Sequence, residues 1–175
     1  MQKLIYHIAC SADGFIAHTD HTVQGFLFEG DHSTDYQESL KSDYSAVLMG
    51  RKTYEFGLQY GVTSPYPWLN QYVISKSMES DPAPEVKLVK DDLLNFIHQL
   101  KKTESKSIYL CGGSVLGGFL LKAGLIDTLI LKTNPVIFGN GIPLFTGVSK
   151  SDVQLILTDN KKYENGVLLS TYQIN

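Results

Sequence analysis

The chain has 175 residues, of which 43% are hydrophobic and 19% are charged, and this balance predicts one globular domain over residues 1–175. Its net charge of −3, without any run of basic residues, argues against nucleic acid as a partner, because that binding needs many clustered cations. The sequence shows neither a secretory signal pattern nor an apolar stretch near the roughly 20 residues that cross a bilayer. We therefore expect a cytoplasmic protein that does not bind membranes.

Strand-like and helix-like segments alternate over most of the chain. Continuous apolar runs are typical of strands buried on both faces, and such runs occupy residues 4–9, 46–49, 72–74, 86–89, 107–111 and 128–133. Helices are expected within residues 34–42, after Asp91–Asp92, and from a capping Ser114 to Gly124. This alternation predicts an α/β fold with a mostly parallel central sheet and helices on both of its faces.

The C-terminal part has a different pattern. Val153, Leu155 and Leu157 alternate with polar residues, and Asn165-Gly166 marks a turn before a partner strand over residues 167–174. Alternation on both sides of a tight turn is typical of an antiparallel hairpin. We expect this hairpin to be appended to the parallel sheet.

Two expected strands end in glycine where a helix begins at once. The first junction is Gly50-Arg51-Lys52-Thr53, and the second is Gly112-Gly113-Ser114-Val115. A helix N-terminus offers unpaired N–H groups and a partial positive charge, and glycine lets a phosphate approach the backbone. Two such junctions on one sheet edge suit a dinucleotide, although either glycine alone could serve only the geometry of the turn. Neither junction has the spacing of a P-loop or of GxGxxG.

Cationic and polar residues accompany these junctions. Arg51 is the only arginine in the chain, and its planar fork suits phosphate oxygens, although it could instead be an ordinary surface residue of a helix. Ser75 and Lys76 follow another strand and could hold a phosphate monoester or form a plain polar turn. The histidines and acids around residues 18–38 match no standard ligand spacing, so we expect no metal site. Cys10 and Cys111 have no CxxC spacing and are expected to be buried free thiols.

Four stretches together resemble the dihydrofolate reductase-like superfamily, and in particular the reductase domain of bacterial riboflavin biosynthesis and its stand-alone relatives. These stretches are residues 11–17 (SADGFIA), 49–55 (MGRKTYE), 111–114 (CGGS) and 135–145 (PVIFGNGIPLF). They occur in the family's order and span nearly the whole chain. The resemblance implies a three-layer sandwich, an NADPH site, and a homodimer to whose interface the C-terminal strands contribute.

The resemblance also implies roles for individual residues. Ala9 and Ile16 would border the nicotinamide under a mobile loop over residues 13–17, and Ser75 and Lys76 would face the adenosine 2′-phosphate. The phosphates would meet the two helix starts, namely Gly50, Arg51, Lys52 and Thr53 on one side and Gly112, Gly113, Ser114, Val115 and Leu116 on the other. An acid on the first helix would assist proton transfer, with Asp35 the first candidate and Asp31 the second.

The function that the resemblance implies is NADPH-dependent hydride transfer to a pteridine-, pyrimidine- or ribosylamino-pyrimidine-like molecule, as in 5-amino-6-(5-phosphoribosylamino)uracil reductase. Residues 20–25 read DHTVQG and lack the second acid and the tryptophan of many relatives. If Arg51 binds the cofactor, no arginine remains to hold a substrate phosphate. Two alternatives stay open: a nucleotide-binding protein without catalysis, and a flavin-binding reductase that uses the aromatic-rich stretch 54–68.

Overall fold

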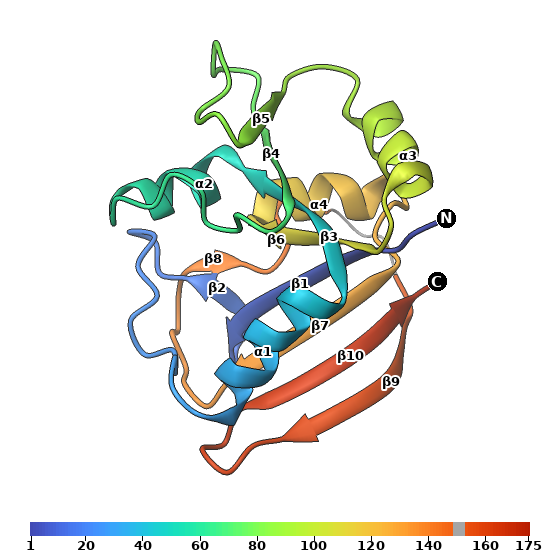
Figure 1. Cartoon of the computed structure of the whole chain (residues 1–175). Coiled ribbons are helices and arrows are strands. Elements are labelled where there is room, and N and C mark those ends of the chain that lie inside the picture. The colour runs from blue at the N-terminus through green and yellow to red at the C-terminus, as the bar shows by residue number, and fades with distance from the viewer. Residues whose placement is uncertain (149–152) are drawn as a thin grey trace.

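A computed structural model describes residues 1–148 and 153–175 (Figure 1). The helices are α1 (Asp31–Ser42), α2 (Arg51–Leu58), α3 (Leu93–Thr103) and α4 (Ser114–Lys122). The strands of the main sheet are β1 (Leu4–Ser11), β3 (Tyr44–Gly50), β4 (Asn70–Ile74), β5 (Val86–Val89), β6 (Ser107–Gly112), β7 (Thr128–Asn134), β9 (Leu155–Lys162) and β10 (Leu168–Ile174). Two short strands, β2 (Phe15–Ala17) and β8 (Ile142–Pro143), pair with each other apart from this sheet.

The main sheet has the order β5-β4-β3-β6-β1-β7-β10-β9. The pairs from β5 to β7 are parallel, whereas β10 runs antiparallel to both β7 and β9. The expected α/β fold with a mostly parallel sheet and a C-terminal antiparallel hairpin is thereby confirmed. Because β3, β6 and β1 are neighbours and parallel, their carboxyl ends meet at one edge of the sheet.

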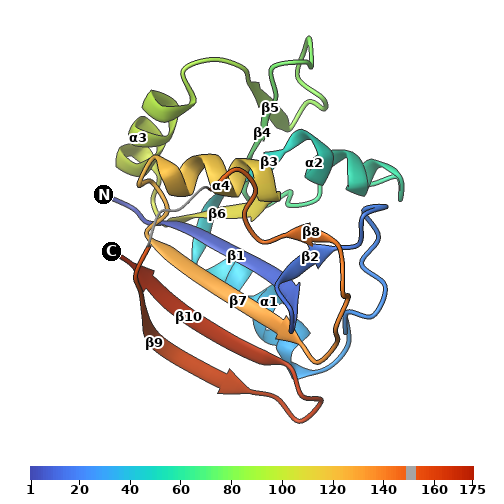
Figure 2. The same cartoon turned by 180° about the vertical axis from the view of Figure 1, so that it is seen from behind.

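Helices cover the sheet on both faces, with α3 and α4 on one face and α1 on the other (Figures 1 and 2). Alternate residues of each strand point to opposite faces. The side chains toward α3 and α4 form an apolar cluster that includes Tyr6, Leu48, Leu110 and Leu129. Those toward α1 form a second cluster that includes Val47, Tyr44 and Tyr109.

Several helix and strand boundaries in the structure differ from those expected from the sequence. Helix α1 begins at Asp31, three residues before the expected range, and β9 begins at Leu155 rather than at Val153. Ser114 is not the cap of α4, because the N-cap position belongs to Gly113 and Ser114 is already helical. Part of the expected mobile loop over residues 13–17 is the strand β2, which pairs with β8. No helix in the described part of the chain combines the length and apolar character of a membrane span.

Candidate functional site

The two glycine junctions lie side by side at the carboxyl edge of the sheet. A Cβ atom added to Gly50 would lie 3.4 Å from the backbone nitrogen of Gly113, and one added to Gly113 would lie 3.2 Å from Thr53 Oγ1. The two helix starts are therefore close together, and a side chain at position 113 would press on Thr53. Neither α2 nor α4 has a side-chain hydrogen bond at its N-cap, so the first N–H groups of both helices remain available to a ligand.

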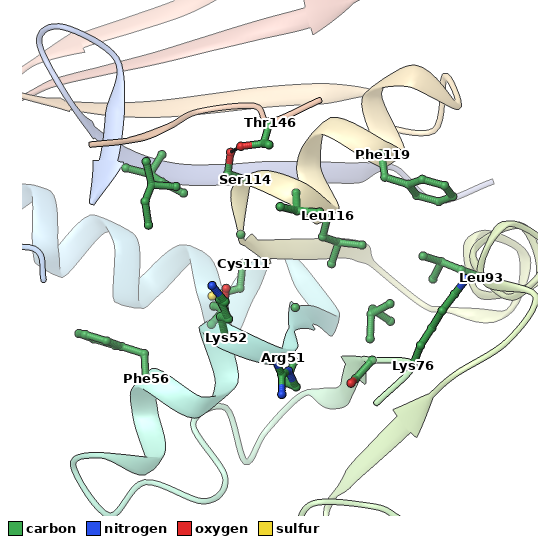
Figure 3. Close-up of a pocket in the computed structure, with 18 of the residues that line it drawn as sticks. Arg51, Lys52, Phe56, Lys76, Leu93, Cys111, Ser114, Leu116, Phe119 and Thr146 are labelled. Atoms are coloured by element: carbon green, nitrogen blue, oxygen red, sulfur yellow. Dashed lines mark hydrogen bonds between the residues drawn. The ribbon is translucent and has the colours of Figure 1, made fainter. Parts of the chain in front are cut away.

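A cleft of about 980 Å³ opens in front of these junctions (Figure 3). Most of the predicted cofactor residues line it, namely Ile16, Gly50, Arg51, Lys52, Thr53, Ser75, Lys76, Gly113, Ser114, Val115 and Leu116. Ala9 and Gly112 are not among the lining residues. The structure thus brings together segments that are up to about 100 residues apart in the chain, as expected for a site built from loops at the carboxyl ends of parallel strands.

The cleft contains cationic and apolar side chains that the sequence analysis did not single out. Lys90 lines it together with Arg51, Lys52 and Lys76, and Phe56, Leu93 and Phe119 supply apolar surface. Figure 3 shows Arg51 and Lys52 on α2 across the cleft from Leu116 and Phe119 on α4. Phe119 follows Val115 by one helical turn, so the helical period alone could have identified it.

The segment before the undescribed residues packs closely on the start of α4. The hydroxyl groups of Ser114 and Thr146 are 2.6 Å apart, and the Thr146 N–H donates to the carbonyl of Ser114. A Cβ atom at Gly118 would lie 2.0 Å from the carbonyl oxygen of Thr146, so this contact requires glycine. Thr146 thereby presents a second hydroxyl beside the N-terminus of α4, in the lining of the cleft.

The pair of β2 and β8 forms one wall of the cleft. Ile16 of β2 and Ile142 of β8 both line it. Asp13 stabilises this region, because its carboxylate accepts hydrogen bonds from the N–H groups of Phe138 and Gly139. A hydrogen bond with Ser11, assisted by these two backbone donors, lowers the pKa of Asp13 to about 2.

The predicted acids lie elsewhere on the molecule. Neither Asp31 nor Asp35 is among the residues that line the cleft. Asp35 accepts hydrogen bonds from Lys161 Nζ at 2.5 Å and from the Tyr163 hydroxyl at 2.6 Å, and these two bonds lower its pKa. A carboxylate held in this way is ionised near neutral pH. The contacts instead join α1 to the C-terminal hairpin.

Cys111 lies on the floor of the cleft and connects it to a group of phenols under α1. The Tyr66 hydroxyl is 3.3 Å from Cys111 Sγ, and the hydroxyls of Tyr36 and Tyr109 are 2.8 Å apart. Burial raises the pKa of the Cys111 thiol and of these tyrosines, so all of them stay uncharged at neutral pH. The sequence predicts two buried free thiols, and of these Cys10 is buried whereas Cys111 is only partly so. Within the described residues, no group of three or more His, Cys, Asp or Glu side chains is arranged to hold a metal ion.

The family model for the RibD C-terminal domain matches residues 2–169 of the chain. The chain belongs to the RibD C-terminal domain family. Among curated proteins of Bacillus subtilis (strain 168) it is similar to "Uncharacterized protein YwjB", at 30% identity over 169 residues that cover 96% of each chain. It is also similar to "Uncharacterized protein YyaP", at 27% identity over 99% of this chain and 96% of the relative.

Solved structures share the fold. A candidate riboflavin biosynthesis protein from Shewanella sp. PV-4 superimposes with a TM-score of 0.84 at 24% identity, over 100% of this chain and 99% of that one. Dihydrofolate reductase from Enterococcus faecalis, complexed with NADP(H), has a TM-score of 0.69 at 20% identity, over 99% of this chain and 96% of that one. The resemblance stated from the sequence and the dihydrofolate reductase-like fold are thereby confirmed, and family and fold together support a reductase-like function.

Proposed function

We propose that the protein is an NADPH-dependent reductase that transfers a hydride to a pteridine-, pyrimidine- or ribosylamino-pyrimidine-like small molecule. The observation that carries this proposal is the contact between the Gly50 and Gly113 junctions, which directs the open N-termini of α2 and α4 into one cleft. Two helix starts that meet in this way suit a pyrophosphate bridge. NADPH, when bound, would supply the hydride.

The residues present fit the phosphates of such a cofactor. Arg51 and Lys52 lie at the start of α2, and Ser114 and Thr146 present hydroxyls at the start of α4. Gly50 and Gly113 are the N-cap residues of α2 and α4, and no side chain caps either helix, so their first backbone N–H groups remain uncovered. Arg51 is half exposed and only 3.7 Å from Glu55, a weak surface pair that leaves its guanidinium free to turn toward a phosphate.

The choice of NADPH over NADH depends on the far end of the cleft. The Ser75 oxygen accepts hydrogen bonds from the N–H groups of Ser77 and Met78, and it lies 3.3 Å from the hydroxyl oxygen of Ser77. Two hydroxyl groups are thus held together at this end, and either could donate to a phosphate oxygen. Lys76 and Lys90 line the same end and are exposed. Two ammonium groups and a hydroxyl would favour the extra 2′-phosphate of NADPH.

At the other end, Ile8, Ile16 and Cys111 form a largely apolar wall suited to the nicotinamide ring. The pair of β2 and β8 would exclude water from this end, which favours hydride transfer over side reactions. Ala9 stays a proposed neighbour of the nicotinamide, and Asp35 and Asp31 stay proposed acids. Their distance from the cleft lining favours, as a second candidate function, a nucleotide-binding protein without catalysis.

A homodimer is part of the proposal. The edge strand β9 is exposed along its whole length and includes Leu155, Ile156 and Leu157, each 43–53% exposed. An exposed apolar edge strand is normally covered in solution. The protein is further proposed to act in the cytoplasm.

The test is a fluorescence titration of the nucleotide-free protein with NADPH and with NADH, before and after Arg51→Ala. We expect saturable binding, weaker binding of NADH, and a loss of about 1.5–3 kcal/mol in the variant, the scale of a hydrogen bond to a charged group. Lys102→Ala, at an exposed position on α3, is the matched control and should bind as the wild type does. If neither nucleotide binds at millimolar concentration, the proposal is wrong.

A further inference from the structure

A buried histidine ties the start of α1 to the turn of the C-terminal hairpin. His32 is the second residue of α1, and only 4% of it is exposed. Its Nε2 atom lies 3.1 Å from the carbonyl oxygen of Leu27, and its Nδ1 atom lies 3.1 Å from the side-chain nitrogen of Asn165. The ring therefore bridges the segment before α1 and the turn between β9 and β10.

The hydrogen bonds of Asn165 determine which nitrogen of this ring carries a proton. The Val167 N–H donates to the side-chain oxygen of Asn165 at 3.3 Å, so the amide nitrogen is the atom that faces the ring. An amide nitrogen only donates, and the Leu27 carbonyl on the other side only accepts. The ring of His32 therefore carries one proton, on Nε2, and accepts a hydrogen bond at Nδ1.

A second proton on the ring has no acceptor in this arrangement. A protonated Nδ1 would point its N–H at the amide hydrogens of Asn165. Turning the amide by half a revolution would satisfy the ring, but it would set the amide nitrogen against the Val167 N–H. Either arrangement brings two donors face to face, and a buried donor without a partner is unfavourable. The contact is also tight, because a Cβ atom at Gly30 would lie 3.2 Å from the Asn165 nitrogen and 3.5 Å from His32 Nδ1.

Charged groups face this ring from β7, from α1 and from the hairpin. Lys132 of β7 donates to the same Leu27 carbonyl, so its positive charge opposes a second one on the ring. Asp35 of α1 is near enough to attract a charged ring, but its carboxylate already accepts from Lys161 and Tyr163. The ring of Tyr163 packs edge-on against the imidazole at 5.7 Å. The other charged side chains of these segments are exposed to water, namely Glu29, Asp31, Lys162 and Glu164.

We infer that His32 and Asn165 form a pH-sensitive latch between the segment before α1 and the C-terminal hairpin. With a neutral ring the latch is closed, and Asn165 also donates to the carbonyl of Glu29. When the ring takes up a proton, Asn165 turns away into water, because this residue is exposed, and the hairpin turn is released. The segment held by the latch follows the loop whose His21 and Val23 line the cleft. The latch does not depend on the reaction that the cleft performs.

The test is hydrogen exchange of the Val167 N–H, measured by NMR on the full-length protein from pH 7 to pH 5 and corrected for the intrinsic pH dependence of exchange. We expect the corrected rate to rise by about tenfold or more in the wild type, since an imidazole released to water takes up a proton over this range. The pKa of His7 is lowered to about 4, below this range. In Asn165→Asp a carboxylate oxygen faces the protonated ring, so the rate should fall or stay constant. The control His98→Gln, at an exposed position on α3, should behave as the wild type does.

A second readout uses the wild type alone, so it decides even where Asn165→Asp does not fold. The nitrogen chemical shifts of His32 at pH 8 should show the proton on Nε2, and protonation of Nδ1 on acidification should coincide with a shift of the Val167 amide resonance. A proton on Nδ1 at pH 8 would overturn the inference. It would equally be overturned by a corrected exchange rate that does not change with pH, or by the same acceleration in Asn165→Asp as in the wild type.

Discussion

The two faces of the central sheet differ in the chemistry that they bury. Toward α3 and α4, the strands contribute mostly aliphatic side chains, among them the fully buried Leu48 and Leu110. Toward α1, the strands also carry His7, Tyr44 and Tyr109. His7 Nδ1 lies 3.3 Å from the Tyr44 hydroxyl, and the ring of Tyr109 packs against both of the other rings. The α3 and α4 face buries mostly apolar groups, whereas the α1 face buries hydrogen-bonding groups beside its apolar ones.

This difference assigns separate roles to the two faces. Apolar burial is the main stabilising term in folding, and the α3 and α4 face carries the larger of the two buried clusters. Burying hydroxyls and imidazoles contributes less, because each must find a partner. A sheet that needed stability alone would be apolar on both faces. The polar face is therefore where binding and specificity are expected, and the predictions below test this division.

The largest effect is expected for Leu110→Ala on the apolar face. Removing a fully buried leucine side chain should lower the free energy of unfolding by about 2–5 kcal/mol. Urea denaturation followed by circular dichroism measures the change. Leu110→Met, which conserves volume, is the control and should lose less than about 1.5 kcal/mol. A loss below about 1 kcal/mol in the alanine variant would mean that this face does not dominate stability.

On the polar face, His7 predicts a dependence of stability on pH. The pKa of its ring is lowered from 6.5 to about 4, so the unfolded chain takes up this proton before the folded chain does as the pH falls. Stability should be complete above about pH 6.5 and decline by about 3 kcal/mol toward pH 4, in addition to the titration of other groups.

The measurement compares denaturation at several pH values for the wild type and for His7→Gln, which can still bond to Tyr44. The difference between the two stability curves should change between about pH 6.5 and pH 4 and stay constant at higher pH. Parallel curves over this range would show that the ring of His7 is not held neutral. The buried surface under α1 would then be more polar than the structure indicates.

Local patterns in the sequence predicted the elements and the two glycine junctions that line the cleft. The Gly50 and Gly112-Gly113 junctions are readable because strand, glycine and helix start follow one another directly. Thr146 was not predicted as part of the cleft, since no local pattern shows that it packs on the start of α4. Its position depends on Gly118, where a Cβ atom would lie 2.0 Å from the carbonyl oxygen of Thr146.

Asp35 shows how long-range contacts add to a local pattern. An acid on the first helix matches the pattern of folate reductases, and helical period alone cannot say toward which neighbour it points. The hairpin supplies Lys161 and Tyr163, which engage this carboxylate from more than 120 residues away. Long-range partners of this kind influence the role of a residue, but no local sequence pattern indicates them.

The smallest effect is expected at Asp13, outside both faces, where an exposed carboxylate holds the segment around residues 138–139. Because its pKa is lowered to about 2 in the fold, its contribution to stability is present above about pH 4 and is lost as the pH falls toward 2. Asp13→Asn should therefore flatten the acid limb of the stability curve and leave the limb above pH 5 parallel to that of the wild type. Acid titration followed by tyrosine fluorescence measures this. An acid limb identical in both proteins would show that Asp13 does not anchor this wall of the cleft, and the wall would then depend on the pairing of β2 with β8 alone.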